Sequence, residues 1–146
     1  MKKILLGILV FSIYLIPMDG SNQPSIDQLK HMVAAKQGKE KVTILKQLTI
    51  ALLSEGKIQE AEVYIQDAEM ISVSEPSQSI LADLQAMKGY AYQSKYDYTN
   101  AGKCFLEELR FRNQMKDDLG VAEAKNRLGF IWYLEKNHDL AVQNLS

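Results

Sequence analysis

Apolar residues recur at the spacing of an α-helix along most of the chain after residue 25. Leu45, Leu48 and Leu52 share one helix face, and Ala61 and Ile65 share another. No segment of comparable length alternates between apolar and polar residues as a half-buried strand does, so the chain is predicted to be all α-helical. Short polar breaks, typical of tight turns between antiparallel helices, occur at residues 55–57, 94–97 and 136–139.

The same helical pattern occurs three times at a fixed offset. Residues 48–65, 88–105 and 128–145 align without a gap, and matched residues stand 40 positions apart. The matched positions include Ala61, Ala101 and Ala141, then Leu52, Tyr92 and Trp132, and then Ile65, Phe105 and Leu145. Self-similarity at a fixed period indicates one supersecondary unit that is used repeatedly. We therefore expect units at residues 42–75, 79–115 and 118–146, the last of them incomplete.

A separate helix is predicted before the first unit. Ser25 is positioned as its N-cap, and Ile26, Leu29 and Val33 then fall on one face. We expect this helix to cover the open apolar side of the first unit. The basic run at residues 36–41 is predicted to be the loop that follows, so residues 21–41 form a leading helix and loop.

Small residues indicate how the two helices of a unit meet. Gly89 and Gly129 lie within predicted helices, where glycine costs about 1 kcal/mol relative to alanine. Each glycine precedes an alanine, Ala101 or Ala141, by twelve residues across a predicted turn. We expect this pairing to let two helix backbones approach closely, with large side chains filling the space beside the contact.

A glycine, an aromatic residue and an alanine recur at set spacings in the second and third units. The residues are Gly89, Tyr92, Ala101 and Phe105 in the second unit and Leu128, Gly129, Trp132 and Ala141 in the third. This pattern resembles the tetratricopeptide repeat family in its long-period bacterial type, although the first unit has Thr49 where glycine is usual. The resemblance implies a right-handed α-solenoid of antiparallel helix hairpins with about three repeats. It also implies binding of a protein or peptide.

The resemblance further implies a binding groove lined by the first helix of each unit. The exposed groove positions map to Lys46, Ile50, Leu53, Ala86, Tyr90, Gln93, Asn126, Phe130 and Tyr133. These residues are mostly aromatic and aliphatic with few charges, which suits an extended or helical peptide that carries apolar side chains. The alternative is that Tyr90, Phe130 and Tyr133 pack between units and do not face a ligand.

Residues 1–20 have the pattern of a secretory signal peptide. Lys2 and Lys3 precede an apolar run at residues 4–16, and Pro17 ends the run. The run is shorter than the roughly 20 residues that a membrane-spanning helix needs. We therefore expect cleavage and export, to the bacterial periplasm. The alternative is an uncleaved N-terminal segment that anchors the chain in the membrane.

Charge and cysteine content narrow the choice of partner. The chain has 17 Lys and Arg residues against 18 Asp and Glu residues, which leaves no basic face of the kind that nucleic-acid binding needs. Cys104 is the single cysteine, so no internal disulfide forms, and it is interpreted as a small buried apolar side chain. The expected partner is a protein or peptide, with no nucleic acid, and with membrane contact only through the N-terminal segment.

Candidate catalytic groups are few. His31 falls in the leading helix and His138 in a predicted turn, and neither has Cys or carboxylate companions at metal-ligand spacing. The acidic pairs at residues 107–108 and 117–118 are interpreted as a solvated helix face and a helix start. The sequence has no glycine-rich phosphate loop and no nucleophile motif. We therefore expect no enzyme activity, no metal and no cofactor.

The third unit lacks the polar-faced cap that a terminal repeat needs. The chain is therefore interpreted as a fragment of a longer array, and self-association through the third unit is expected. Together with the leader, this favours the exported sensory or adaptor region of a longer bacterial signalling protein. The alternatives are a stand-alone periplasmic scaffold or assembly factor, and the accessory repeat region of an enzyme encoded downstream.

Overall fold

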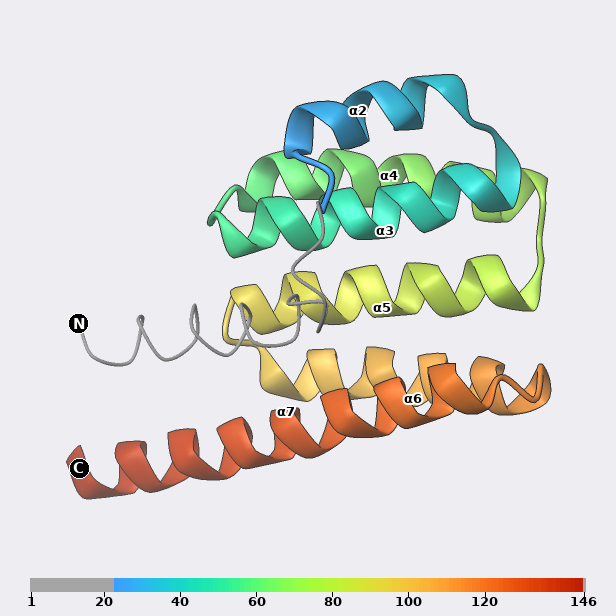
Figure 1. Ribbon diagram of the computed structural model, residues 1–146. Helices are drawn as coiled ribbons and strands as arrows, with labels where there is room; N and C mark the ends of the chain where they lie inside the picture. The colour runs from blue at the N-terminus through green and yellow to red at the C-terminus, as the bar shows by residue number, and fades with distance from the viewer. Residues whose placement is uncertain (1–22, 146) are drawn as a thin grey trace.

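Six α-helices make up the regular secondary structure of residues 23–145, which the computed structural model describes, with side chains as far as Asp139 (Figure 1). They are α2 (Ile26–Ala35), α3 (Gly38–Ser54), α4 (Ile58–Ser74), α5 (Gln78–Ser94), α6 (Tyr98–Gln114) and α7 (Asp118–Leu145). The prediction of an all-α fold is confirmed for these residues. The predicted signal peptide at residues 1–20 lies outside the described residues.

Polar side chains cap the first turns of α2, α5, α6 and α7. Ser25 caps α2 as predicted: its Oγ accepts the backbone N–H of Gln28 at 3.2 Å, and the Gln28 side chain accepts the backbone N–H of Ser25 at 2.8 Å. Asp97 and Asp117 cap α6 and α7 by accepting the backbone N–H three residues later, at 3.1 and 3.0 Å. The predicted helix start at residues 117–118 is therefore confirmed.

Three turns reverse the chain with the same backbone geometry. Gly56, Tyr96 and Lys116 have positive φ angles of 73°, 62° and 55°. The N–H of each donates to the carbonyl three residues back at 3.0 Å, and the next N–H donates to the carbonyl five residues back at 2.9 to 3.0 Å. This turn satisfies the last carbonyls of one helix and lets the next helix start at once. The turns predicted near residues 55–57 and 94–97 are confirmed.

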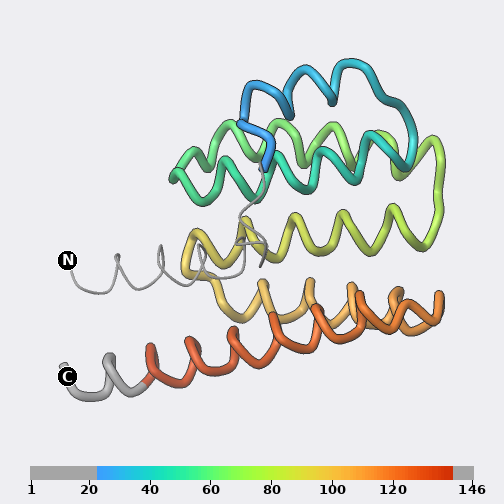
Figure 2. Tube along the Cα trace, viewed as in Figure 1, coloured from blue at the N-terminus to red at the C-terminus, as the bar shows by residue number. Residues whose placement is uncertain are grey.

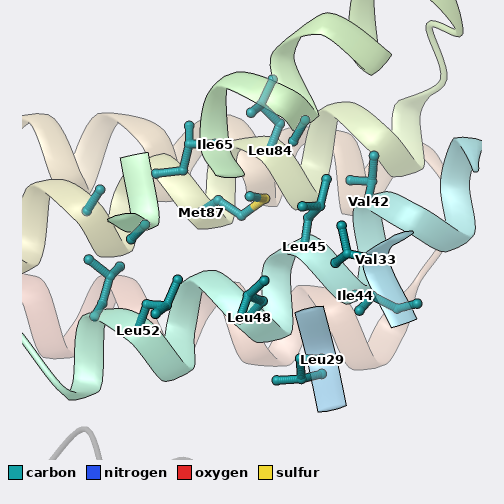
Figure 3. Close-up of a cluster of buried hydrophobic side chains, with 14 of the residues drawn as sticks. Leu29, Val33, Val42, Ile44, Leu45, Leu48, Leu52, Ile65, Leu84 and Met87 are labelled. Atoms are coloured by element: carbon teal, nitrogen blue, oxygen red, sulfur yellow. The ribbon is translucent and has the colours of Figure 1, made fainter. Parts of the chain in front are cut away.

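The buried apolar side chains form two clusters. The larger cluster joins α2, α3, α4 and α5, and Figure 3 shows Leu45, Leu48 and Met87 within it. The predicted face of α2 lies on this cluster through the buried side chains of Leu29 and Val33. The smaller cluster, between α6 and α7, consists of Ala101, Phe105, Leu128 and Ile131. The core therefore has two parts, one on each side of α5.

Successive helices run in opposite directions and lie in a row, as the trace in Figure 2 shows. α3 packs against α4 and α5, α4 also packs against α5, and α5 packs against α6. α3 with α4 and α5 with α6 therefore form two helix pairs, and the two pairs contact each other through α5. α2 packs against α3 and covers the outer side of the first unit (Figure 1), whereas α7 makes its main helix contact with α6.

The third unit is one continuous helix and not a hairpin. α7 extends for 28 residues and passes through residues 136–139, where a turn was predicted, so that prediction is wrong. Lys136 stands 40 residues after Tyr96 and 80 after Gly56, but it stays helical where those two residues turn the chain. The repeat pattern therefore holds for the helix starts from α3 to α7 and ends within α7.

The part of α7 that continues past the expected turn contacts the first turn of α6. Glu135 accepts a hydrogen bond from the Thr99 hydroxyl at 2.9 Å, and the ring of His138 meets Tyr98 edge-on with 6.2 Å between centroids. A turn at residues 136–139 would move the ring of His138 away from Tyr98. Asn137, the counterpart of the capping Asp97, does not cap a new helix, and its side chain donates to the carbonyl four residues back at 2.9 Å.

The predicted loop at residues 36–41 is also wrong, because α3 begins at Gly38. Val42 is fully buried, and Lys41 forms an ion pair with Asp67 of α4 at 2.9 Å. Burial of Val42 brings this segment onto the core as the first turn of a helix. The basic run is therefore the solvated side of that turn.

Close packing at a glycine occurs in the second unit and not in the third, and the residue nearest to Gly89 is Phe105 and not the predicted Ala101. A Cβ atom on Gly89 would lie 2.5 Å from the ring of Phe105, so α5 and α6 meet where only glycine fits. At Gly129, no atom of the described residues lies within 4 Å of that position, apart from its two neighbours and the nearby backbone of α7 itself. The difference follows from the straight α7, which has no second helix folded back against it.

Replacing each glycine by alanine tests this difference. Gly89→Ala is expected to lower the free energy of unfolding by about 1–3 kcal/mol, because the new methyl group meets the ring of Phe105. Gly129→Ala places the same methyl group in open space. This change is expected to raise the free energy of unfolding by up to about 1 kcal/mol, because alanine has the higher helix propensity. Urea unfolding of both variants is the measurement. Equal destabilisation by the two changes would contradict an open position at Gly129.

Candidate functional site

The nine residues predicted to line a groove divide between the core and the surface. Leu53 and Ala86 are buried, so the expectation that they are exposed is wrong; the packing of α3 against α5 encloses this side of both helices. Two others, Asn126 and Tyr133, are exposed. The remaining five are partly buried: Lys46, Ile50, Tyr90, Gln93 and Phe130.

Tyr90 packs between helices, which agrees with the alternative interpretation of this residue. Its ring meets Phe105 edge-on with 5.4 Å between centroids, and its hydroxyl oxygen accepts the Nε–H of Arg127 at 2.6 Å. The guanidinium carbon of Arg127 lies 5.4 Å from the centroid of the Tyr90 ring. Tyr90 therefore ties α5 to both α6 and α7.

A buried carboxylate joins three helices near the division of the core. Asp83 of α5 is 4% exposed and accepts a hydrogen bond from Nζ of Lys46 on α3 at 2.7 Å. The same oxygen accepts an N–H of Arg112 from α6. Arg112 also reaches Asp117 at the start of α7, with 3.3 Å between Nη1 and Oδ2. Burying these charges is costly unless they are paired, and the pairs are present.

Glu108 of α6 has no exposed surface and lies between two arginines. Nη1 of Arg127 on α7 donates to its two carboxylate oxygens at 3.0 and 3.3 Å, and Nε of Arg112 lies 3.7 Å from one of them. Nη2 of Arg127 also donates to Glu123 at 3.1 Å. We call Asp83, Glu108, Arg112 and Arg127 the charged seam, because they join α5, α6 and α7 where the two apolar clusters adjoin.

Burial changes the titration of the groups in and beside the seam. It raises the pKa of Glu108 above its usual value, and the positive charges of Arg127, Arg112 and Lys46 oppose that shift. Burial also raises the pKa of the Tyr90 hydroxyl, against the influence of Arg127. Tyr90 therefore keeps its proton while its oxygen accepts the Arg127 hydrogen bond.

The sequence interpretation of the adjacent carboxylates as a solvated face is wrong for Glu108. Glu107 does lie at the surface, where it pairs with Arg110 at 2.9 Å. Glu108 follows the fully buried Phe105 by three residues, and it stands 40 residues after the fully buried Ala68. The repeat register therefore assigns position 108 to the core, and that was the signal available in the sequence.

α7 exposes large aromatic side chains on two sides. Asn126, Phe130 and Tyr133 are spaced by four and three residues and share one side, which we call the Tyr133 face. Tyr133 is 60% exposed. Trp132 is 57% exposed and lies on the neighbouring side. We call that side the Gly129 flank, formed by Lys125, Gly129, Trp132 and Lys136.

Groups that carry chemistry are dispersed over residues 23–139. His31 is exposed on α2, and His138 lies within α7 and not in a turn as predicted. Burial raises the pKa of the half-buried Cys104 thiol, which disfavours the reactive thiolate. Over these residues no three His, Cys, Asp or Glu side chains gather to hold a metal ion. None of the helices from α2 to α7 has the length and apolar character needed to cross a membrane.

The chain has no match among protein-family models, curated proteins or solved structures. The features from which a function can be argued are therefore the surfaces of α7 and the charged seam beneath them. The seam is buried and cannot meet a macromolecular ligand. α7, in contrast, presents aromatic side chains to solvent on both the Tyr133 face and the Gly129 flank.

Arg112→Met tests whether the seam stabilises the fold. The change should lower the free energy of unfolding by about 3–5 kcal/mol, because Asp83 and Glu108 lose a buried counter-charge. Arg110→Met is the matched control on the same helix. Its pair with Glu107 is exposed, so the expected change is within about 0.5 kcal/mol. Chemical denaturation of both variants is the measurement, and similar effects of the two changes would contradict a structural role for the seam.

Glu108→Gln tests the raised pKa of the buried carboxyl group. The pKa of Glu108 in the folded chain lies above its usual 4.5, so the folded state takes up a proton more readily than the unfolded state. The parent chain should therefore gain stability relative to Glu108→Gln as pH falls through the folded pKa, with the full gain below 4.5. Urea unfolding of both chains over a pH series measures this. A relative loss on acidification would show that the arginines lower the pKa.

Proposed function

We propose that the chain is a non-catalytic module that binds a protein or peptide, built of stacked helix hairpins of the tetratricopeptide type. The contact of α3 and α4 with α5 and α6, together with a turn of one geometry inside each pair, supports the repeat interpretation. Arrays of this kind bind ligands along extended surfaces formed by successive units. We place the module in the exported sensory or adaptor region of a bacterial signalling protein because of the leader pattern at residues 1–20.

The Tyr133 face is the observation that carries this proposal. Tyr133 is 60% exposed and stands beside the exposed Asn126 and the half-buried Phe130. Tyrosine and phenylalanine are enriched at protein interfaces relative to the rest of the surface. A surface of this kind on a helix that is packed against α6 on another side supports a binding role.

The contacts beneath the face hold it in one position. Arg127 lies one residue after Asn126 and is fixed by Glu108, Glu123 and Tyr90 on three different helices. A surface that is ordered before the ligand arrives avoids part of the entropy cost of binding. We therefore expect the Tyr133 face to keep its shape when a ligand binds.

The chemistry of the face suits an apolar ligand. Arg127, next to Asn126 in the sequence, already pairs with Glu108 and Glu123. Contacts to Phe130 and Tyr133 would supply most of the affinity, so binding should depend little on salt concentration. The expected ligand is an extended or helical peptide segment that carries apolar side chains.

A paired substitution tests the proposed ligand surface. The tagged chain is used to capture proteins from a cell-envelope extract, and Phe130→Ala combined with Tyr133→Ala should abolish the capture while the melting temperature stays within a few degrees. Met70→Ala is the control, because Met70 is 66% exposed on α4, away from the face. Tyr90 is left intact, since its removal would disturb packing. Undiminished capture by the paired variant would contradict the proposal.

A further inference from the structure

The outward side of α4 carries a line of exposed apolar side chains. Val63, Met70 and Val73 are 61, 66 and 83% exposed. Together with the exposed Gln59 and Gln66, they follow one another at spacings of four, three, four and three residues. This is the spacing of a coiled-coil seam, along which a second helix can pack. We call these five residues the α4 stripe.

The second unit shows that the fold does not require apolar residues on this side. α6 has the same place in its unit as α4, and each helix buries an alanine on the opposite side, Ala61 in α4 and Ala101 in α6. Forty residues after the α4 stripe, however, α6 has mostly polar residues, and all of them are exposed: Thr99, Lys103, Leu106, Arg110 and Asn113. Large exposed apolar side chains that gather on one face mark an interaction surface.

The charges beside the α4 stripe are neutralised within the chain. α4 has four acidic residues and no lysine or arginine, and the acidic residues flank the stripe on both sides. Each of them pairs with a lysine from a neighbouring element: Glu60 with Lys30 at 2.6 Å, Asp67 with Lys41 at 2.9 Å, Glu69 with Lys88 at 2.6 Å, and Glu62 with Lys95. These pairs reduce the repulsion that two acidic helices would otherwise have, and they give no preference to a strongly charged partner.

The stripe also matches itself. A two-fold pair places the same surface of both copies in contact, so a stripe that pairs in this way must be complementary to itself. In an antiparallel pair about an axis near position 68, Val63 of one copy lies opposite Val73 of its partner, and Met70 lies opposite Gln66. Every apolar side chain of the stripe is then covered. Charge and residue order therefore both favour a second copy of this chain as the occupant.

The size of the stripe sets the strength of such a pair. α4 has 17 residues and is therefore about 25 Å long. One helix of this length supplies only part of the roughly 800 Å² per partner that stable complexes bury. We therefore expect a weak pair that dissociates on dilution.

We propose that the α4 stripe is the contact through which two copies of this chain pair about a two-fold axis. α7 lies at the other end of the row of helices (Figure 1), so the Tyr133 face stays free in the pair. The pair then presents two Tyr133 faces, which can engage a ligand that has two binding segments. The pairing itself goes beyond the proposed function and does not depend on it.

Sedimentation velocity over about a hundredfold range of protein concentration tests the pairing. The sedimentation coefficient of the parent chain should rise with concentration towards that of a dimer. Met70→Glu should weaken the association at least tenfold, because it adds a negative charge to the stripe of both copies. Leu106→Glu is the matched control, since Leu106 is 49% exposed on the matching side of α6 and should leave the association unchanged. Both variants should keep the melting temperature within a few degrees.

Mixing two charge variants tests whether the contact is direct. Met70→Glu and Met70→Lys chains should form a mixed dimer, because opposite charges then meet across the axis. No mixed dimer would show that Met70→Glu does not act at a contact between copies, and would overturn the pairing.

The remaining outcomes separate this inference from the proposed function. A parent chain that stays monomeric, or equal weakening by Met70→Glu and Leu106→Glu, overturns the pairing. Association that persists in Met70→Glu overturns it in favour of another surface. The variant with Phe130→Ala and Tyr133→Ala should pair normally, and Met70→Glu should still capture envelope proteins when it is fixed on a resin. Pairing by the first variant, if that variant also captures the same proteins as the parent, would leave the α4 contact standing while the Tyr133 face fails.

Discussion

The buried carboxylate of Glu108 is the constraint on which the arrangement of α5, α6 and α7 depends. A carboxylate with no exposed surface is tolerated only where cations and hydrogen-bond donors surround it. Arg127 supplies them from α7, and Arg112 links the same region to Asp83 of α5. The apolar contacts alone fall into two clusters. Tyr90 packs on both clusters, and the charged seam adds paired charges across the same boundary.

The sequence predicted the helices, turns and caps that depend on local patterns. It failed where contacts between helices determine the structure. Apolar spacing and turn chemistry predicted the helices around Leu45 and Phe105 and the cap at Ser25. The turn predicted at residues 136–139 was wrong: Asn137 has the position of the capping Asp97, but α7 continues through it, and Glu135 and His138 contact α6. The exposure of the predicted groove positions depends on the neighbouring helices, so it could not be predicted from one repeat.

The straight α7 has consequences for binding. A helix that folds back would cover its own flank, as α6 covers α5 at Gly89. Because α7 continues, the Gly129 flank stays open while the opposite contacts hold the helix on α6. Arg127 then connects the side of α7 that carries the Tyr133 face to the charged seam. One helix thus presents two different surfaces, and their orientation is set by the same buried charges.

A double-mutant cycle between Glu108 and Arg127 tests the central claim most directly. The free energy of unfolding is measured for Glu108→Gln, for Arg127→Met and for the combined variant, at fixed pH and salt. If the seam fixes α7 on α6, the effects are non-additive, with a coupling energy of about 1–3 kcal/mol. Additive effects, within about 0.3–0.5 kcal/mol, would show that the apolar contacts alone hold α7 and would contradict this explanation of the fold.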